Sequence, residues 1–422
     1  MRIVVIGGGA GGLVAAWSLA GAHEVWLLEA QPMLGGNIRT LGRNVQPNVR
    51  PDLAAGLHLD AGVVEFPKPW FPRFHALMRH LGVELAAVPG TSAYFPADGR
   101  QFLTPQALLH TTHHDVRWKL RALARLTPLL SARQAFLKRT AHLTDAQLYA
   151  HRFVDFLEPG DLRMWLKLLC TYAWSIPLAQ VDDIPAALAV PVMRSIVSSI
   201  EWSGVVGGAY AYVEKIVAQL ETDGAHIQTQ CAVRGVTRGP DGVRVAMPDG
   251  SVLHCDAVVL AVTPDRVLSL LPDADETETR WFAPWRGNDA VTVLHMDTGL
   301  YTRRGVSWYS EFDVFETGAN TGGYNAYLNR LNQVPEGRGH YSLALAMDHE
   351  VDPEKVIHRQ EHHAPLYTVE ALAQRPDVLA HNGHRATWYA GAWLGDGLHE
   401  GAVVSGLAVG AQLGGRTLLP NG

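Results

Sequence analysis

The sequence predicts an α/β protein in which a Rossmann-like, nucleotide-binding sheet carries an inserted domain of mixed α+β structure. Three observations lead to this prediction. A glycine-rich turn joins an apolar strand to a helix near the N-terminus, and an acidic residue ends the following strand. The chain has 422 residues, which exceeds the size at which a single hydrophobic core stops growing. We therefore expect two lobes.

The composition is that of a compact globular protein. Hydrophobic residues make up 47% of the chain and charged residues 18%, which leaves little room for disorder. The net charge of −6 makes nucleic acid an unfavourable partner. The cysteines, Cys170, Cys231 and Cys255, form no CxxC pair, which argues against a disulfide framework or a zinc ribbon. We expect a cytoplasmic protein, because no apolar run approaches the roughly 18 residues of a membrane span.

The N-terminal turn lies in the context of a dinucleotide-binding unit. The predicted strand Ile3–Ile6 runs into a cluster of glycines, and a predicted helix over Leu13–Ala20 follows. A second predicted strand, Glu24–Leu28, ends at Glu29. An acid about twenty residues beyond such glycines is typical of dinucleotide binding.

Each residue of this pattern has a physical task. Gly7 permits the tight turn, Gly9 lets the backbone approach a pyrophosphate, and Gly12 lets the helix pack on the strand. The helix N-terminus offers N–H groups and a partial positive charge to the phosphates. Glu29 is suited to accept hydrogen bonds from the ribose hydroxyls. The residues predicted to bind the cofactor here are Gly7, Gly9, Gly11, Gly12, Glu29 and Ala30.

A second glycine pair, Gly35-Gly36, follows in the stretch QPMLGGNIRT. This stretch resembles the signature of the FAD-binding amine oxidase and phytoene desaturase superfamily, in which the pair returns the chain over the pyrophosphate. The resemblance implies FAD as the cofactor and a ββα-type domain like that of p-hydroxybenzoate hydroxylase and the amine oxidases. It also implies cofactor contacts by Asn37, where the superfamily commonly has Arg, and by Arg39 and Thr40.

The C-terminal stretch WYAGAWLGDGLHEGAVVSGLAVGAQLGG resembles the closing motif of the same superfamily. That motif consists of a strand, a glycine loop and a helix that begins at Glu-Gly-Ala. The resemblance implies that backbone N–H groups at the helix start lie near the flavin pyrimidine edge, where negative charge develops on reduction. It implies flavin contacts by Gly391, His399, Glu400, Gly401 and Ala402.

Short strands are predicted in the middle of the chain, over Gln228–Val236, Val243–Met247 and Ala257–Val262. Val233 stands where such flavoproteins offer backbone to the adenine. Because the motifs span the chain from end to end, the cofactor domain is expected to be discontinuous. Its predicted segments are 1–80, 205–275 and 380–422, and the predicted substrate domain with its helical insertion comprises 81–204 and 276–379.

Three further stretches narrow the resemblance: LLCTYAWSIP, VVGGAYAYVEKI and the pair SWYSEF and GGYNAYLNRLN. Together they resemble the bacterial NAD/FAD-binding flavoproteins encoded beside methyltransferases similar to cyclopropane-fatty-acid synthase. Amine oxidases commonly place Tyr or Trp two residues before the Glu of the closing motif, where this chain has Leu398. An aliphatic wall at that place fits an alkyl or alkenyl substrate better than a polar amine.

The resemblance implies a flavin-dependent oxidoreductase that takes hydride from a substrate C–H to flavin N5. The expected enzyme is a desaturase or double-bond isomerase acting on a hydrophobic fatty acyl or isoprenoid substrate, with His399 as the candidate base. Two alternatives stay open. One is an amine or amino-acid oxidase that yields imine and hydrogen peroxide, and the other is a non-catalytic flavin-binding partner protein. The sequence leaves the oligomeric state open.

The stretch His358-Arg-Gln-Glu361-His362 matches a zinc-binding pattern. Pro353 and Pro365 bracket it, and the sequence offers no identifiable third ligand. We therefore predict a short helix and no metal site.

Residues 113–139 are rich in basic side chains and include Trp118. An amphipathic basic helix here suits a peripheral contact with a membrane surface, and a solvated helix face is the alternative interpretation.

Aromatic residues gather near the third quarter of the chain. Trp308, Tyr309, Tyr324 and Tyr327 either line a substrate channel or pack the inserted sheet, and the spacing of the last two predicts that they face different ways. Cys170 lies in an apolar stretch and is expected to be a buried small hydrophobe.

Overall fold

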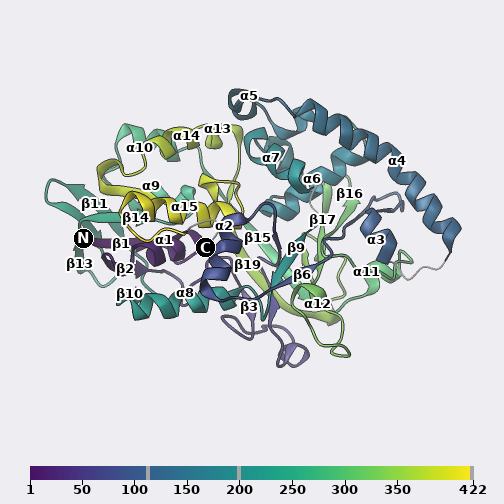
Figure 1. The fold of residues 1–422 in the computed structure, drawn as a ribbon, viewed down its shortest axis with the longest axis horizontal. Helices are drawn as coiled ribbons and strands as arrows, with labels where there is room; N and C mark the ends of the chain where they lie inside the picture. Colours follow the sequence, from purple (N-terminus) through teal and green to yellow (C-terminus); the bar gives the residue numbers. More distant parts are fainter. Residues whose placement is uncertain (111–114, 197–200, 419–422) are drawn as a thin grey trace.

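A computed structural model of the chain describes residues 1–110, 115–196 and 201–418. Its first layer is a five-stranded parallel sheet, which lies at the left of Figure 1. The strands come from three separate parts of the sequence, which confirms the predicted α/β fold class. In sheet order they are β10 (His226–Gln228), β2 (Glu24–Leu28), β1 (Arg2–Ile6), β14 (Ala257–Leu260) and β20 (Thr387–Tyr389).

Both faces of this sheet are covered, which explains why its strands are apolar throughout. Side chains alternate along β1, so that Ile3 and Val5 enter one hydrophobic core while Val4 and Ile6 enter a second. The helices that contribute to the first core are α1 (Ala10–Leu19), α2 (Pro72–Leu81), α8 (Tyr210–Thr222) and α15 (His399–Gln412).

Helix α1 begins at Ala10, three residues before the predicted start at Leu13. Gly11 and Gly12 therefore lie inside the helix and are fully buried with it. A Cβ on Gly12 would lie 1.9 Å from the carbonyl oxygen of Gly7. These glycines form helix despite their low propensity because tertiary contact leaves no room for a side chain.

The predicted strand Gln228–Val236 is interrupted in the structure. Strand β10 ends at Gln228, and Gln230 has a positive φ of 53°, which breaks the extended conformation. The chain then enters a separate antiparallel sheet, made of β11 (Gly235–Gly239), β12 (Gly242–Ala246) and β13 (Val252–Cys255).

The second layer is a seven-stranded mixed sheet at the right of Figure 1. Its neighbouring strands pair antiparallel except for β16 and β7, which pair parallel. In sheet order they are β19 (Val356–Leu366), β15 (Arg286–His295), β18 (Ser342–Leu345), β17 (Thr321–Tyr327), β16 (Asp313–Gly318), β7 (Ala93–Phe95) and β8 (Phe102–Leu103).

Further helices lie over both halves of the molecule, and α4 follows the outer margin at the right (Figure 1). The longer ones are α4 (Val116–Arg139), α6 (Asp161–Trp174) and α7 (Ala186–Ile196). The shorter ones are α3 (Pro105–His110), α5 (Asp145–Ala150), α9 (Pro264–Leu270), α10 (Glu276–Phe282), α11 (Gly299–Thr302), α12 (Leu328–Leu331), α13 (Val369–Leu372) and α14 (Arg375–Ala380). Two small sheets join the layers, one of β3 (Thr40–Leu41) with β4 (Leu59–Asp60) and one of β5 (Phe66–Pro67), β9 (Trp202–Val205) and β6 (Leu85–Val88).

The predicted short helix around His358 is wrong, because this stretch is the strand β19. Its long antiparallel pairing with β15 overrides the local helical spacing. His358 and His362 are buried on one face of the strand, about 13 Å apart along it at the usual rise per residue. In the described part of the chain, no three His, Cys, Asp or Glu side chains gather closely enough to hold a metal ion.

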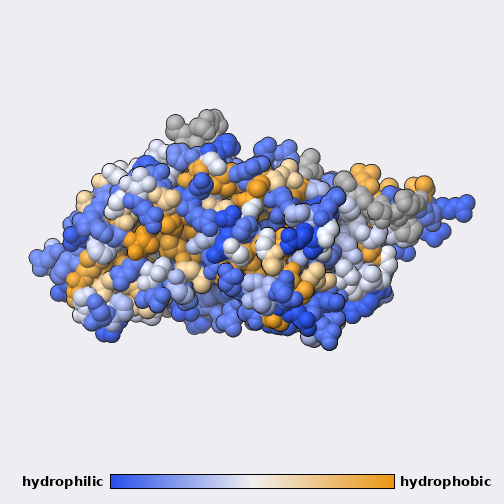
Figure 2. All heavy atoms as spheres, turned by 90° about the horizontal axis from the view of Figure 1, so that it is seen from below, coloured by the Kyte–Doolittle hydropathy of each residue, from blue (hydrophilic) through white to orange (hydrophobic). Residues whose placement is uncertain are grey.

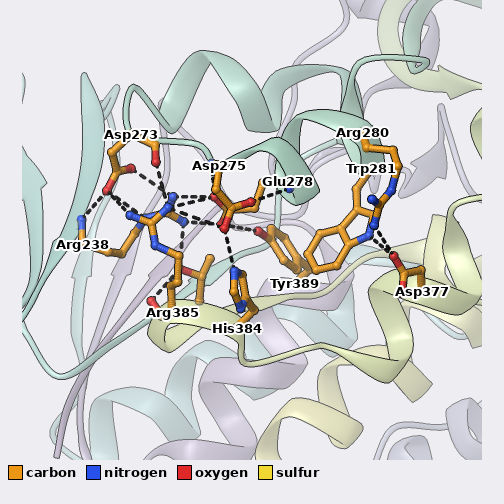
Figure 3. Close-up of polar contacts among 11 residues, drawn as sticks. Arg238, Asp273, Asp275, Glu278, Arg280, Trp281, Asp377, His384, Arg385 and Tyr389 are labelled. Atoms are coloured by element: carbon orange, nitrogen blue, oxygen red, sulfur yellow. Dashed lines mark hydrogen bonds and ion pairs between the residues drawn. The ribbon is translucent and has the colours of Figure 1, made fainter.

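A buried ion network anchors the C-terminal segment (Figure 3). The guanidinium of Arg238 donates two hydrogen bonds, of 2.7 and 2.8 Å, to the carboxylate of Glu278, and that carboxylate is fully buried. Arg385 donates to the same carboxylate at 3.2 Å and to Asp273 at 3.1 Å. Since Arg385 stands just before β20, the network fixes this strand against β11 and α10.

None of the described helices is long and apolar enough to span a lipid bilayer.

Candidate active site

The first glycine turn lies at the carboxyl end of β1, where open α/β sheets bind nucleotides. Gly7 has a φ of +108° and donates from its N–H to the carbonyl of Leu28 at 2.8 Å. Gly9 is the N-cap of α1, and neither a capping side chain nor an acidic residue occupies the first turn of this helix. The N-terminus of α1 thus has the character of a phosphate site.

The second glycine pair closes over the first. The N–H of Gly35 donates to the carbonyl of Gly8 at 2.7 Å. A Cβ on Gly36 would lie 3.0 Å from the Cα of Gly9. The backbones of the two loops are therefore in direct contact. A side chain at this contact would fill the space that a bound pyrophosphate needs.

Glu29 ends β2 beside the first loop. One carboxylate oxygen accepts from the N–H of Gly8 at 2.6 Å, and the other accepts from the N–H of Gln31 at 2.8 Å. Ala30 is exposed next to it. Val233 is half-buried in the chain that leaves β10, and this segment returns to Glu29 through a hydrogen bond from the N–H of Cys231 at 2.8 Å.

The residues after the second glycine pair have different environments. Asn37 is exposed and donates from its side chain to the carbonyl of His363 at 2.9 Å. Arg39 is half-buried, and desolvation lowers the pKa of its guanidinium. Thr40 is fully buried and bonds the carboxylate of Asp60 at 2.5 Å. Thr40 therefore stabilises the protein interior through Asp60 and does not line the surface of the glycine loops.

The closing motif lies directly against the first glycine turn. A Cβ on Gly11 would lie 3.0 Å from the nitrogen of Gly391, and one on Gly406 would lie 2.6 Å from the carbonyl oxygen of Gly11. Helices α1 and α15 thus pack so closely that only glycine fits at the contact. The two ends of the sequence meet at one place, between β1 and β20.

Asp396 occupies the start of α15. Its carboxylate accepts from the N–H groups of Leu398 at 2.8 Å and of Gly401 at 2.9 Å, and the N–H of Ala402 donates to the carbonyl of Leu398. Within the described residues, this leaves the first two N–H groups of the helix, those of His399 and Glu400, as its open donors.

The side chain of Glu400 points away from this start. Its two carboxylate oxygens accept from the N–H groups of Arg73 and Phe74, each at 2.8 Å, and so cap helix α2. Burial raises the pKa of Glu400 to about 7. Any contact of Glu400 with a cofactor thus falls to its backbone.

His399, the predicted base, has its ring in the core of the cofactor half. The ring lies edge-on to Phe66 and Phe74, and its Nε2 contacts the hydroxyl of Tyr212 at 2.5 Å. Burial lowers the pKa of His399 to about 4. These surroundings are those of a structural histidine, and its role as a base stays a prediction.

A buried acid that the sequence reasoning missed immediately precedes β5. Glu65 contacts Tyr172, whereas the neighbouring Phe66 contacts His399. Glu65 is 6% exposed, accepts a hydrogen bond from the Tyr172 hydroxyl, and its second oxygen has no partner among the described residues. Burial, with the nearby carboxylate of Glu311, raises the pKa of Glu65 well above its usual value.

Aromatic rings surround Glu65. Tyr172 stacks on Phe312 at 5.4 Å and meets Tyr324 edge-on at 4.9 Å, and Phe312 contacts Trp202 at 4.8 Å. Tyr324 belongs to this cluster, whereas Tyr327 lies on the other side with Tyr309 and His340.

The cluster around Glu65 lies between the cofactor loops and the second sheet. A Cβ on Gly62 would lie 2.2 Å from the carbonyl oxygen of Asn37, so Gly62 touches the residue that follows the second glycine pair. Gly62 stands three residues before Glu65, and their Cα atoms are therefore at most about 10 Å apart. At the other end of the cluster, Trp174 donates to the carbonyl of Asp396 at 3.0 Å. Tyr172 thus stands two residues from a contact with the closing motif.

These features fit FAD. The loop cradle, the open start of α1, the acid at the end of β2 and the start of α15 correspond to pyrophosphate, ribose and flavin positions. The two loops approach so closely that a side chain at Gly36 would obstruct the cradle.

Solved structures have the same fold at low sequence identity. A CLA-producing fatty acid isomerase from P. acnes matches with a TM-score of 0.70 and 17% identity over 98% of each chain. A putrescine oxidase solved with putrescine matches with a TM-score of 0.68 and 16% identity over 99% of this chain and all of that one. Cyclohexylamine oxidase from Brevibacterium oxydans matches with a TM-score of 0.65 and 14% identity over 98% and 99%.

No curated protein matches the sequence at a significant level. The family described as flavin containing amine oxidoreductase matches residues 10–361, which is most of the chain. This match includes the second glycine loop and ends before the closing motif, and it establishes an FAD-dependent oxidoreductase. The protein therefore belongs to the flavin-containing amine oxidoreductase family.

Proposed function

We propose that this oxidoreductase acts on a hydrophobic chain, fatty acyl or isoprenoid, as a desaturase or a double-bond isomerase. We also propose that it resembles the bacterial flavoproteins encoded beside methyltransferases similar to cyclopropane-fatty-acid synthase. The observation that carries the proposal is the position of Glu65. An acid with one free oxygen stands in an aromatic enclosure between the cofactor loops and the second sheet.

The enclosure suits an uncharged substrate. Burial raises the pKa of the Glu65 carboxyl, which favours its neutral form. The rings of Tyr172, Tyr324 and Phe312 pack together beside this carboxyl and make its surroundings apolar. An alkenyl chain can enter without desolvating a charge, which would be costly here.

FAD, when bound, supplies the two-electron oxidation that removes hydride from a substrate carbon. The faces of Tyr172 and Tyr324 are placed to stabilise positive charge that develops on the chain. In desaturation the chain also loses a proton, which the free oxygen of Glu65 accepts in its ionised form. The substrate then leaves with one more double bond and two fewer hydrogens. Isomerisation would leave the number of hydrogens on the chain unchanged, so it needs no net proton transfer to Glu65.

Amine oxidation is the second candidate, and the same cluster favours it. A carboxylate beside two tyrosine rings is also suited to hold an ammonium group. Binding of a cation would then draw Glu65 into its ionised form against the cost of burial. Leu398 stands where amine oxidases commonly have an aromatic residue. This difference favours the apolar substrate over an amine.

Mass spectrometry of lipids tests the proposal. The purified holoprotein is incubated with unsaturated free fatty acids and with phospholipids, and the products are extracted. Desaturation lowers the product mass by two hydrogens, and isomerisation leaves the mass unchanged while the double bond moves. Neither change in any lipid, together with hydrogen peroxide released from an amine, would overturn the proposal in favour of the second candidate.

A further inference from the structure

Helix α4 combines an exposed apolar stripe with an exposed basic one. Val116, Leu120, Leu123 and Leu130 recur at the spacing of one helix face, and they are 67%, 60%, 48% and 43% exposed. Single exposed leucines are ordinary, but a row of four along one helix is not. At the same end of the molecule, Leu109 of α3 is 80% exposed.

The basic stripe runs beside the apolar one. Arg117, Arg121 and Arg125 follow one another at every fourth residue, and all three are exposed. The whole helix carries no acidic residue. Its basic residues are Arg117, Lys119, Arg121, Arg125, Arg133, Lys138 and Arg139.

A third face attaches the helix to the protein. Ala122, Leu126, Leu129 and Phe136 are buried, and α4 contacts α6 and β8 through this side. At about 100° per residue, the buried face, the apolar stripe and the basic stripe occupy different sectors of the helix. The apolar and basic stripes therefore both face outward without disturbing the fold.

The position and the charge of α4 set this surface apart from the rest of the protein. Figure 1 places α4 along the outer margin of the molecule, far from the parallel sheet, and Figure 2 shows some hydrophobic side chains at this end of the molecule. The protein as a whole has a net charge of −6, whereas α4 is purely positive. An anionic surface would attract this end and repel the remainder, which orients the molecule.

We propose that α4, with Leu109 of α3, docks the protein on the surface of a membrane that contains anionic phospholipid. The apolar stripe enters the boundary between headgroups and acyl chains, and the arginine stripe contacts the phosphates. The long arginine stems let the guanidinium groups reach the headgroups while their methylenes stay beside the apolar stripe. This extends the expectation for residues 113–139, of which 113 and 114 lie outside the described residues. Docking does not depend on the identity of the substrate.

Vesicle flotation tests this proposal with the FAD-loaded protein. The probes are vesicles of phosphatidylcholine alone and of phosphatidylcholine with phosphatidylglycerol, at physiological and at high salt. We expect the protein to float with the anionic vesicles and to be released by high salt. We expect at least tenfold weaker binding for the triple variant Leu120→Gln, Leu123→Gln, Leu130→Gln, and for Arg117→Glu, Arg121→Glu, Arg125→Glu.

Matched controls keep the outcome interpretable. Leu379→Gln removes a side chain that is 46% exposed on another helix, and Lys215→Glu reverses an exposed charge on α8. Both controls should bind like the original protein, and all variants should retain FAD and their thermal unfolding midpoint. The proposal is wrong if the original protein stays unbound at every lipid composition, or if the controls lose binding as the α4 variants do. Loss of a dimer in the leucine variant, without any vesicle binding by the original protein, would assign the stripe to a second copy instead.

Discussion

Gly11 and Gly391 lie in contact although they come from opposite ends of the sequence. A Cβ on Gly11 would lie 3.0 Å from the nitrogen of Gly391 and 3.1 Å from its Cα. This contact brings the opening glycine turn and the closing motif to one site. The cofactor site therefore exists only when the parallel sheet is complete, since β20 is its last strand.

Alanine substitutions in the first turn should weaken FAD binding in a graded way. Gly12→Ala places a Cβ 1.9 Å from the carbonyl oxygen of Gly7, so the turn must shift and overpacking of this kind costs about 1–3 kcal/mol or more. We expect at least a tenfold rise in the Kd for FAD, measured by quenching of flavin fluorescence on the apoprotein. Gly11→Ala should have a smaller effect. Gly239→Ala is the control, because nothing lies within 4 Å of its added Cβ, and equal affinity for Gly12→Ala and the control would contradict the account.

Glu65→Gln should separate desaturation from isomerisation. Gln keeps the shape of the side chain but cannot accept a proton, so we expect desaturation to fall by about 10²–10⁴-fold. Isomerisation should survive, because it needs no net proton transfer. In the unsubstituted enzyme, kcat/KM for desaturation should rise with pH, since the base must be ionised and the pKa of Glu65 is raised by burial.

Tyr172→Phe is the companion variant. It removes the hydrogen bond to Glu65 but leaves the ring, so the pH profile of desaturation should shift to higher pH while the binding of substrate changes little. A flat pH profile in the unsubstituted enzyme, or full desaturation by Glu65→Gln, would remove Glu65 from the mechanism.

Acid should destabilise the protein through buried histidines. Burial lowers the pKa of His295, His340, His362 and His399 to about 4 each, from an ordinary value of 6.5. Between these values the unfolded chain binds protons that the folded protein excludes, so the free energy of unfolding falls as the pH falls from about 6.5 to 4.

His399→Gln should reduce the number of protons taken up on unfolding by up to one. The slope of the free energy of unfolding against pH should then fall by up to about 1.4 kcal/mol per pH unit. Urea unfolding between pH 5 and 7 measures it, with the exposed His142→Gln as the control. The variant also tests the predicted base. If desaturation is lost at every pH while stability is unchanged, His399 is catalytic and its structural role is refuted.

Removing one partner from the ion network of Figure 3 should lower the free energy of unfolding more than removing both partners. Glu278→Ala removes a carboxylate that neutralises the buried guanidinium of Arg238. We expect the free energy of unfolding, measured with urea, to fall by about 3–5 kcal/mol. Replacing both residues, with Arg238→Met and Glu278→Leu, should cost less than the single change. The control is Arg280→Met on the same helix, whose ion pair with Asp377 is exposed, so its loss should be at most about 1 kcal/mol. A double variant less stable than Glu278→Ala would contradict this account of the network.

Local patterns in the sequence predicted the cofactor half well. The turn at Gly7, the acid Glu29 and the helix after Leu398 are signalled by residues close to one another in the chain, where geometry follows from spacing. The stretch around His358 was mispredicted because its strand depends on β15, whose pairing no local spacing records. Glu65 was missed because its partners, Tyr172 and Tyr324, lie far away in the sequence. A lone acid among Val64, Phe66 and their apolar neighbours was the only available signal.

The position of Glu400 shows the same limit. The closing motif predicted a helix that begins at Glu400. In the structure this helix begins one residue earlier, at His399. The motif could not predict that the Glu400 side chain caps α2, because that helix belongs to a distant part of the chain.

Anaerobic mixing of the FAD-loaded protein with candidate substrates tests the central claim most directly. The absorbance of the oxidised flavin in the blue is followed after addition of an unsaturated fatty acid, an unsaturated phospholipid or a primary amine. The account predicts that a lipid bleaches this band or emerges with a moved double bond, while the amine does neither. Bleaching by the amine alone, with every lipid recovered unchanged, would contradict it.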